Sequence, residues 1–246
     1  MTVVSKRVSI QWPPEDASEP TTTMVFTAPS DKFVDLRPLK IPQTEKEEKF
    51  PFEWAIVGYE QVLPENKIQF HHTMDSRLVN EIYYAKKNNL LLPSTEDTPD
   101  IGHFTTLPNG DKREDGEMLN IATGKIQPYI EIWRSLDLTR ATPDSPIAAS
   151  EQQDVPTVKC IVLEVNDDIY EGRFIIIGNW AQGILNNKKT DYNENYSSSM
   201  SCIRVYFRNN KWEPLVEYGI DIEKFPVGFT GKIGDYQGIW KCIELS

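Results

Sequence analysis

The sequence predicts an all-β protein made of two consecutive antiparallel β-barrel domains. Three observations lead to this prediction. Many short segments alternate between polar and apolar residues, as strands with one buried face do. Pairs of Asn and Gly residues that favour tight turns separate several of these segments. A tryptophan-bearing segment near the middle of the chain recurs at its end, which indicates two related domains.

Alternating segments occur in both halves of the chain. In the first half they contain the following residues: Val8, Ile10 and Trp12; Met24 and Phe26; Phe33 to Leu36; Ile68, Phe70, His72 and Met74. In the second half they are Cys160 to Val165, Arg173 to Leu185, Cys202 to Phe207, Trp212 to Tyr218 and Tyr236 to Leu245. Turns that suit hairpins are predicted at Asn109-Gly110, Asn209-Asn210 and Gly234-Asp235.

One helix is expected among these strands. It covers Ser76 to Lys87, where Leu78, Val79, Ile82 and Tyr83 share a face after a possible Ser cap. Long helices are opposed elsewhere by seventeen prolines spread along the chain, because each fixes φ and removes a backbone donor.

A domain boundary is expected near residues 139-157. This stretch, TRATPDSPIAASEQQDVPT, is polar, contains three prolines and has no periodicity. We therefore expect an N-terminal β-barrel domain over residues 1-145 and a C-terminal β-barrel domain over residues 155-246. At 246 residues, the chain is long enough for two modest cores.

The internal repeat supports this division. The segments Ile132 to Leu138 and Ile239 to Leu245 are identical or chemically alike at six of seven positions. Each half also has an earlier apolar segment with one tryptophan and a nearby glycine, FPFEWAIVG and FIIIGNWAQG. We expect each domain to end with a tryptophan-bearing strand that closes its barrel, since closure leaves no unpaired edge.

Charge and cysteine usage exclude several classes of partner. The net charge is −11, and residues 157-246 hold 10 Lys and Arg against 12 Asp and Glu, which leaves −9 for residues 1-156. Because no basic stripe is present, nucleic acid and anionic membranes are disfavoured as direct partners. No apolar run is long enough to cross a bilayer, so we expect no direct membrane insertion and a cytosolic protein. Three widely spaced cysteines, Cys160, Cys202 and Cys242, are expected to be reduced and partly buried thiols.

No motif for catalysis, a metal or a cofactor is evident. The chain lacks a GxSxG elbow, a GxxxxGK[ST] phosphate loop, a GxGxxG fingerprint and an HExxH motif. The three histidines are His71, His72 and His103. Adjacent residues of a strand point to opposite faces, so we expect one of His71 and His72 to be packed and the other solvated. The chain is therefore expected to be non-enzymatic and to need no cofactor.

A G-x-W triplet, Gly178-Asn179-Trp180, gives the one hint of a binding cavity. In lipocalin-like barrels such a tryptophan plugs one barrel end beneath a basic side chain of the last strand, a part that Lys241 could take here. The candidate ligand-binding residues are Trp54, Trp133, Trp180, Trp240 and Lys241. For the tryptophans, core packing is the interpretation we prefer.

Specific segments resemble a fungal protein family named for its interaction with a casein kinase I. They are Leu36-Arg37-Pro38, FPFEWA, the Trp133 strand with its trailing Asp137, and IVLEVNDDIYEGRFIIIGNWAQGIL. The resemblance covers nearly the whole chain, with little match between Met74 and Gln127. It implies two lipocalin-like β-barrel domains, a homodimer in cytoplasm and nucleus, and binding to a casein kinase I. A link to the endoplasmic-reticulum (ER) translocation machinery is a further implied possibility, whereas catalysis and specific functional residues are not implied.

Two functions remain open at this point. The first is a non-catalytic interaction protein whose surface binds a kinase or another protein. The second is a carrier that holds a small apolar ligand inside a lipocalin-like barrel. An open, apolar interior of a few hundred Å³ favours the carrier, and an interior filled by the tryptophans favours the interaction protein.

Overall fold

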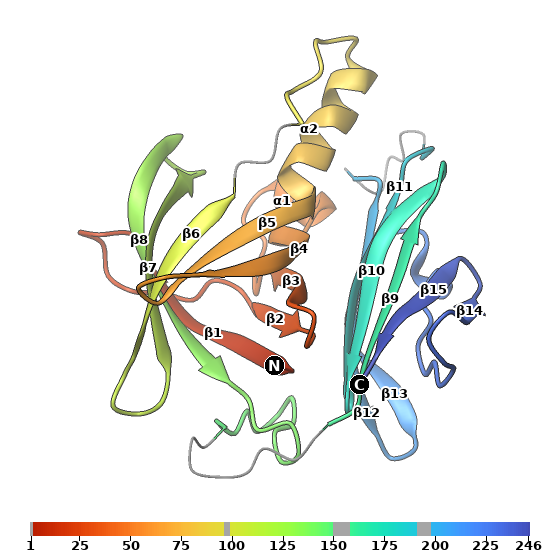
Figure 1. Cartoon of the computed structure of the whole chain (residues 1–246). Helices are drawn as coiled ribbons and strands as arrows, with labels where there is room; N and C mark the ends of the chain where they lie inside the picture. Colours follow the sequence, from red (N-terminus) through yellow and green to blue (C-terminus); the bar gives the residue numbers. More distant parts are fainter. Residues whose placement is uncertain (1, 96–98, 150–157, 191–197) are drawn as a thin grey trace.

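The first half of the chain forms a closed barrel of eight antiparallel strands (Figure 1). The computed structural model describes residues 2-95, 99-149, 158-190 and 198-246. The barrel strands are β1 (Val3–Gln11), β2 (Met24–Thr27), β3 (Lys32–Pro38), β4 (Phe52–Leu63), β5 (Lys67–Asp75), β6 (Asp100–Thr106), β7 (Lys112–Asn120) and β8 (Lys125–Ser135). Each strand pairs with the next, and β8 closes the barrel by pairing with β1 from Ser5↔Ser135 to Gln11↔Ile130.

The second half forms a seven-stranded sheet. Its strands are β9 (Cys160–Asn166), β10 (Tyr170–Ile177), β11 (Trp180–Asn187), β12 (Met200–Arg208), β13 (Lys211–Tyr218), β14 (Tyr236–Gln237) and β15 (Trp240–Leu245). Their order is β13-β12-β11-β10-β9-β15-β14. The predicted all-β fold with barrel-like halves is confirmed. The second half is a curled half-barrel, because its sheet stays open with β13 and β14 at the edges.

The internal repeat has a topological counterpart. In the first half the last strand, β8, pairs with the first strand, β1. In the second half β15, the last strand, pairs with β9, the first, in the register Lys241↔Glu164. The two similar segments therefore occupy equivalent positions in the two sheets.

The hairpin predictions are correct in two places and incomplete elsewhere. Asn209 and Asn210 both have positive φ and join β12 to β13, and Asn109-Gly110 turns between β6 and β7. The apolar run Arg173 to Leu185 is two strands, because Gly178 at φ 56° makes a two-residue turn inside it. The run Tyr236 to Leu245 is divided in the same way at Gly238, with φ 60°.

Gly234-Asp235 does not join two strands of a hairpin. It precedes β14, and Gly234 N donates to the carbonyl oxygen of Cys242.

The expected helix is present as α2 (Ser76–Lys87). Its N-cap is Asp75 and not Ser76, since the Asp75 carboxylate accepts from the backbone nitrogen of Arg77 at 2.7 Å. Ser76 instead accepts a hydrogen bond from Ala55 N at 3.0 Å, which ties the helix to β4. The remaining helices are short, namely α1 (Glu45–Lys49), which begins with a capping box at Thr44, and the 3₁₀ turn η1 (Ile222–Lys224).

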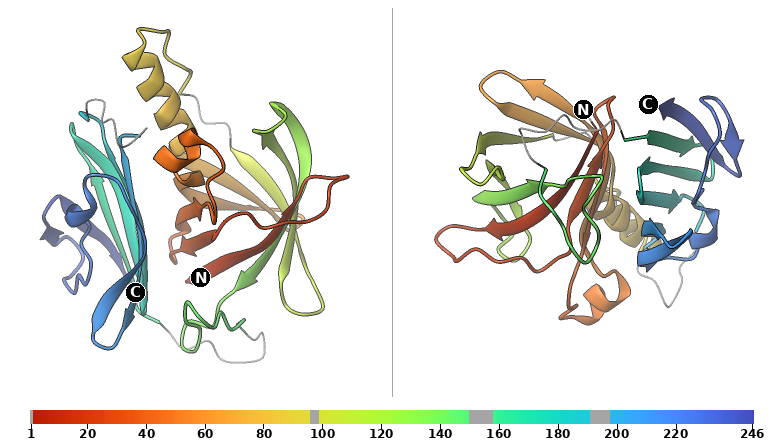
Figure 2. Two further views of the ribbon diagram at one scale, coloured as in Figure 1. Left: turned by 180° about the vertical axis from the view of Figure 1, so that it is seen from behind. Right: turned by 90° about the horizontal axis from the view of Figure 1, so that it is seen from below.

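The barrel and the second sheet lie side by side and share one core (Figure 2). Outward-facing barrel residues such as Phe26, Val34 and Leu36 belong to the same buried cluster as Ile175 and Ile184 of the second sheet. The other face of the second sheet is covered by its own chain, because Phe225 and Phe229 pack there with Trp240. The outside of one barrel wall is therefore as apolar as a protein interior.

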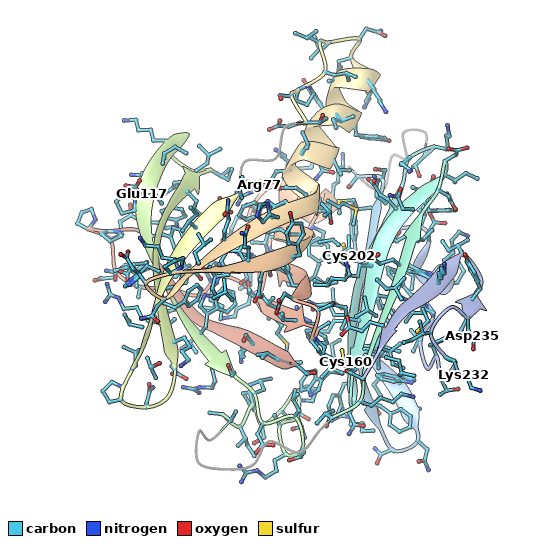
Figure 3. All side chains as sticks on the ribbon, in the orientation of Figure 1. Arg77, Glu117, Cys160, Cys202, Lys232 and Asp235 are labelled. Carbon is cyan, nitrogen blue, oxygen red and sulfur yellow. The ribbon has the colours of Figure 1, made fainter. Side chains whose placement is uncertain are left out.

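The cysteines are free and buried, as predicted. Figure 3 shows Cys160 and Cys202 on the second sheet, and both belong to the shared core beside the barrel. Burial raises the pKa of the Cys160 thiol to about 12, so it stays protonated at neutral pH.

The predicted linker lies partly outside the described residues, which leave out residues 150-157. The residues just before this gap are hydrogen-bonded to the end of β8 and to the residues after it. Ala149 N donates to the Ser135 carbonyl, and Asp137 N donates to the Ile147 carbonyl. Within the described ranges, the two helices and the 3₁₀ turn are all too short or too polar to span a bilayer.

Candidate functional site

The N-terminal barrel contains a cavity of about 420 Å³ that opens to solvent, here called the lumen. All eight strands contribute to its lining, because alternate residues of each strand point inward. A volume of this size is typical of small-molecule sites.

Much of the lumen wall is apolar. It is formed by Val25, Phe33, Ile56, Ile68, Phe70 and Phe104. Phe70 forms edge-to-face pairs with Phe33 and with Phe104, with ring centroids 6.1 and 6.2 Å apart. Edge-to-face rings of this kind form a continuous apolar surface against which a ligand body can pack.

A second part of the wall is charged. The inner charge cluster consists of Asp35, Arg37, Glu114 and Glu131. Arg37 donates from Nε to Asp35 Oδ2 at 2.8 Å and from Nη1 to Glu131 Oε1 at 3.3 Å. Burial alone would lower the pKa of Arg37, but the two carboxylates raise it overall, so the guanidinium stays charged.

Arg7 completes this network from β1. Its side chain is fully buried and donates from Nη1 to Glu131 Oε1 at 2.6 Å. It also reaches Glu19 and Glu53, at 2.9 and 2.8 Å. Every charge of this network is therefore paired, which is the condition under which buried charges are tolerated.

Glu114 is the neutral member of the inner charge cluster. Its two oxygens accept hydrogen bonds from Tyr129 Oη at 2.6 Å and Trp133 Nε1 at 2.8 Å. Burial, and then the charge of Glu131, raise the pKa of Glu114 to about 8. At neutral pH this carboxyl group is mainly protonated.

His72 lies on the lumen side of β5. Its Nδ1 is 3.2 Å from Asp75 Oδ2 and its Nε2 is 3.6 Å from Asp100 Oδ2. His71 points the other way and stacks on Tyr59 with ring centroids 4.5 Å apart. The expectation that the two histidines face opposite sides is confirmed. Among the residues that the structure describes, no group of three or more His, Cys, Asp or Glu could hold a metal ion.

The structure places the five candidate residues in four locations. Trp54 and Trp133 line the lumen together. Trp180 lies in the shared core, with its ring centroid 4.6 Å from that of Tyr206. Trp240 lies on the far face of the second sheet, and Lys241 is directed toward the ring of Tyr236 at 5.9 Å, so neither joins Trp180.

The inner charge cluster is absent from the candidates derived from the sequence, although a signal exists. In β3, Phe33, Asp35 and Arg37 alternate with Val34 and Leu36. The alternation predicts polar and apolar residues on opposite faces of the strand, without showing which face points into the barrel. Because the second sheet covers the outside of this wall, Val34 and Leu36 face outward into the shared core. Asp35 and Arg37 face the lumen together with Phe33.

Comparison with known proteins identifies similar chains in yeasts. A family model described as "Protein HRI1" matches residues 3–244. A Protein HRI1 of Vanderwaltozyma polyspora is 29% identical over 248 residues, covering 94% of this chain and 93% of the relative. One of Lachancea thermotolerans is 27% identical and covers 99% and 92%. The crystal structure of an uncharacterized Saccharomyces cerevisiae protein has a TM-score of 0.77 at 24% identity, covering 100% of this chain and 99% of that one, and it supports the fold.

Proposed function

The chain belongs to the HRI1 family of yeast proteins, and on that premise we propose that it is a non-catalytic binding protein whose N-terminal barrel encloses a small, largely apolar ligand. Neither the family nor the barrel fold suggests catalysis.

The observation that supports this proposal is the lumen itself. It has a volume of about 420 Å³, and the apolar part of its wall includes the aromatic side chains Phe33, Phe70 and Phe104. In the second half, Trp240 takes the place that Trp133 has in the first. It is buried with Phe225 and Phe229, which cover the face of the second sheet that points away from the barrel. In this proposal the first half supplies the binding cavity, and the second half packs against the outside of the barrel wall.

A neutral fluorophore, N-phenyl-1-naphthylamine, tests the proposal. Its emission should rise on binding to the wild-type chain and fail to rise with Val25→Trp, which fills the lumen from β2. Ile101→Trp is the matched control, because Ile101 is 46% exposed on the barrel wall outside the lumen. Undiminished binding to a folded Val25→Trp variant would place the fluorophore elsewhere and refute the lumen as the site.

We further propose the interaction role implied by the family resemblance. In this proposal the chain binds a casein kinase I, forms a homodimer in cytoplasm and nucleus, and contacts an ER translocation component. The supporting observation is the charge of −9 carried by residues 1-156, which suits a basic partner. Sedimentation equilibrium at micromolar concentration tests the dimer, and a monomer there would remove it.

A further inference from the structure

Asp35, a residue of the lumen wall, has a buried carboxylate oxygen without a hydrogen-bond partner among the residues that the structure describes. The residue is 3% exposed, and its Oδ2 accepts the hydrogen bond from Arg37. Within the described ranges, no donor reaches Oδ1. A buried carboxylate oxygen without a partner is costly, because it has lost its hydration and gained nothing in return. This position is where a ligand donor would be most strongly favoured.

The charge of the lumen determines which donor fits. Six carboxyl groups line it, from Asp31, Asp35, Glu60, Asp100, Glu114 and Glu131, against the cations Arg37 and Lys112. With Glu114 protonated at neutral pH, five carboxylates line the lumen beside two cations, and Arg7 adds a third cation from behind the wall through its ion pair with Glu131. Both cations have partners already, since Arg37 bonds Asp35 and Lys112 Nζ donates to Thr106 Oγ1 at 2.6 Å. A cationic ligand is favoured in this field and an anionic one is opposed.

The apolar side chains of the lumen determine what kind of ligand body fits beside this donor. Phe33 lies two residues before Asp35 on β3, so both side chains project into the lumen from the same strand face. Phe70 and Phe104 continue the surface from the neighbouring strands β5 and β6. A ligand that places a donor on Asp35 therefore lays its remaining atoms along aromatic rings.

We infer that the lumen takes a hydrophobic primary amine, with its ammonium group on Asp35 Oδ1 and its apolar body against Phe33 and Phe70. This inference rests on the proposed function of the same cavity. The ammonium supplies the missing hydrogen bond and a positive charge together, which a neutral alcohol or a fatty acid cannot do. Phe33 and Phe70 accommodate the body without further polar contacts.

Calorimetric titration of the full chain with three probes at pH 7 tests the ligand class. The probes share one body and differ in the head group: 4-phenylbutylamine, 4-phenylbutan-1-ol and 4-phenylbutyrate. The amine is protonated at this pH, as lysine is. We expect it to bind at least about tenfold more tightly than the other two.

Two variants test whether a preference for the amine depends on Asp35. Asp35→Asn keeps the shape of the side chain and removes its charge. The affinity for the amine should therefore fall about tenfold, to the affinity of the alcohol, while the affinity for the alcohol stays unchanged. Asp168→Asn removes the same charge in an exposed turn of the second half and should change nothing.

The outcomes separate the two proposals. Equal binding of the three probes, or an amine affinity unaffected by Asp35→Asn, would overturn the amine and leave the lumen as a binding site. Binding of none of them would overturn both proposals together. If Asp35→Asn fails to fold, the wild-type ranking of the three probes still decides the class.

Discussion

The guanidinium of Arg204 on β12 donates from Nη2 to the backbone carbonyl oxygen of Leu36 on β3 at 2.8 Å, across the junction between the sheet and the barrel. Its Nη1 reaches the carbonyl of Thr22 at 2.7 Å, and its Nε reaches Gln182 Oε1 at 2.6 Å. Gln182 in turn donates to the carbonyls of Met24 and Val34, both at 2.9 Å. A polar row of the second sheet thus binds the barrel backbone inside an apolar core.

Removing the Arg204 guanidinium should destabilise the whole chain. Arg204 is 3% exposed, and this burial lowers its pKa to about 9, so the group is still charged at neutral pH. Arg204→Met should lower the free energy of unfolding by about 3–5 kcal/mol, because three buried acceptors lose their donor. Urea denaturation monitored by tryptophan fluorescence measures this loss.

Arg208→Met is the matched control on the same strand. Arg208 forms exposed ion pairs with Glu213 and Asp144, which solvent screens, so the unfolding midpoint should hardly change. Equal effects of the two substitutions would show that the junction contributes little to stability.

Trp180→Ala should lower the free energy of unfolding by about 3–5 kcal/mol, the usual cost of emptying a large buried aromatic site. Trp180 is 2% exposed and packs on Tyr206 in the shared core. A loss below about 1 kcal/mol in denaturant titration would contradict the burial described above.

A pair of milder substitutions isolates the indole hydrogen bond. Trp240 Nε1 donates to the Lys224 carbonyl at 2.7 Å, whereas Trp180 Nε1 has no partner among the described residues. Trp240→Phe should therefore cost about 1 kcal/mol more than Trp180→Phe. The opposite order in the same titration would contradict this assignment.

Glu114 should make the protein less stable as pH rises toward 8. Its folded pKa of about 8 is raised above the ordinary value, so between these two values the folded chain binds more protons than the unfolded chain. Stability from this group is fully present below the ordinary pKa of about 4.3 and is lost as pH rises through 8. Unfolding free energies measured from pH 5 to 9 should show this decline.

Glu114→Gln keeps a neutral, hydrogen-bonding side chain and should flatten the decline. Glu117→Gln, on the exposed side of β7, is the control and should leave the profile unchanged (Figure 3). A wild-type profile with no more decline than Glu114→Gln would show that Glu114 is ionised throughout this pH range.

Limited proteolysis should cut first between Thr139 and Thr157, at the predicted domain boundary. The two fragments should nevertheless elute together on gel filtration, because the halves share a core and the Arg204 contacts. Earlier cleavage elsewhere would count against the boundary, and separation of the fragments would count against the shared core.

Association with a casein kinase I should weaken as salt increases. The charge of −9 on residues 1-156 would attract a basic partner through screened electrostatics. Between about 0.05 and 0.5 M salt the Debye length falls severalfold, so the affinity measured by calorimetry should fall too. An affinity that does not change across this range would show that the acidic residues serve solubility and do not attract the kinase.

The strands could be predicted largely from local alternation, but the direction of their faces could not. In β3 the same two-residue period is satisfied whichever set faces inward, and the choice depends on what covers the barrel outside. That cover is supplied by residues such as Ile175 and Ile184, almost 150 positions away. Asp35 and Arg37 were therefore missed as lumen residues.

The sequence did not predict that the second sheet stays open. Trp133 and Trp240 lie in similar segments, and the strands that carry them each pair with the first strand of their sheet. Whether a sheet closes depends on strand number and stagger, which a seven-residue match does not contain. The turn at Gly178 had a signal in the sequence that was overlooked, because Gly178-Asn179 is a pair typical of two-residue hairpins. The turn at Gly238 is harder to predict, since the apolar Ile239 follows the glycine.

The unclosed edge at β13 has a consequence for aggregation. A free edge exposes backbone donors and acceptors to which a strand from another molecule can add, the first step toward fibrils. β13 carries Pro214, which has no backbone donor, and its pairing with β12 shifts between Arg204 and Val205. Charged side chains of Lys211, Glu213 and Glu217 repeat along the same edge. The half-barrel can therefore stay open at high protein concentration without templating intermolecular sheets along β13.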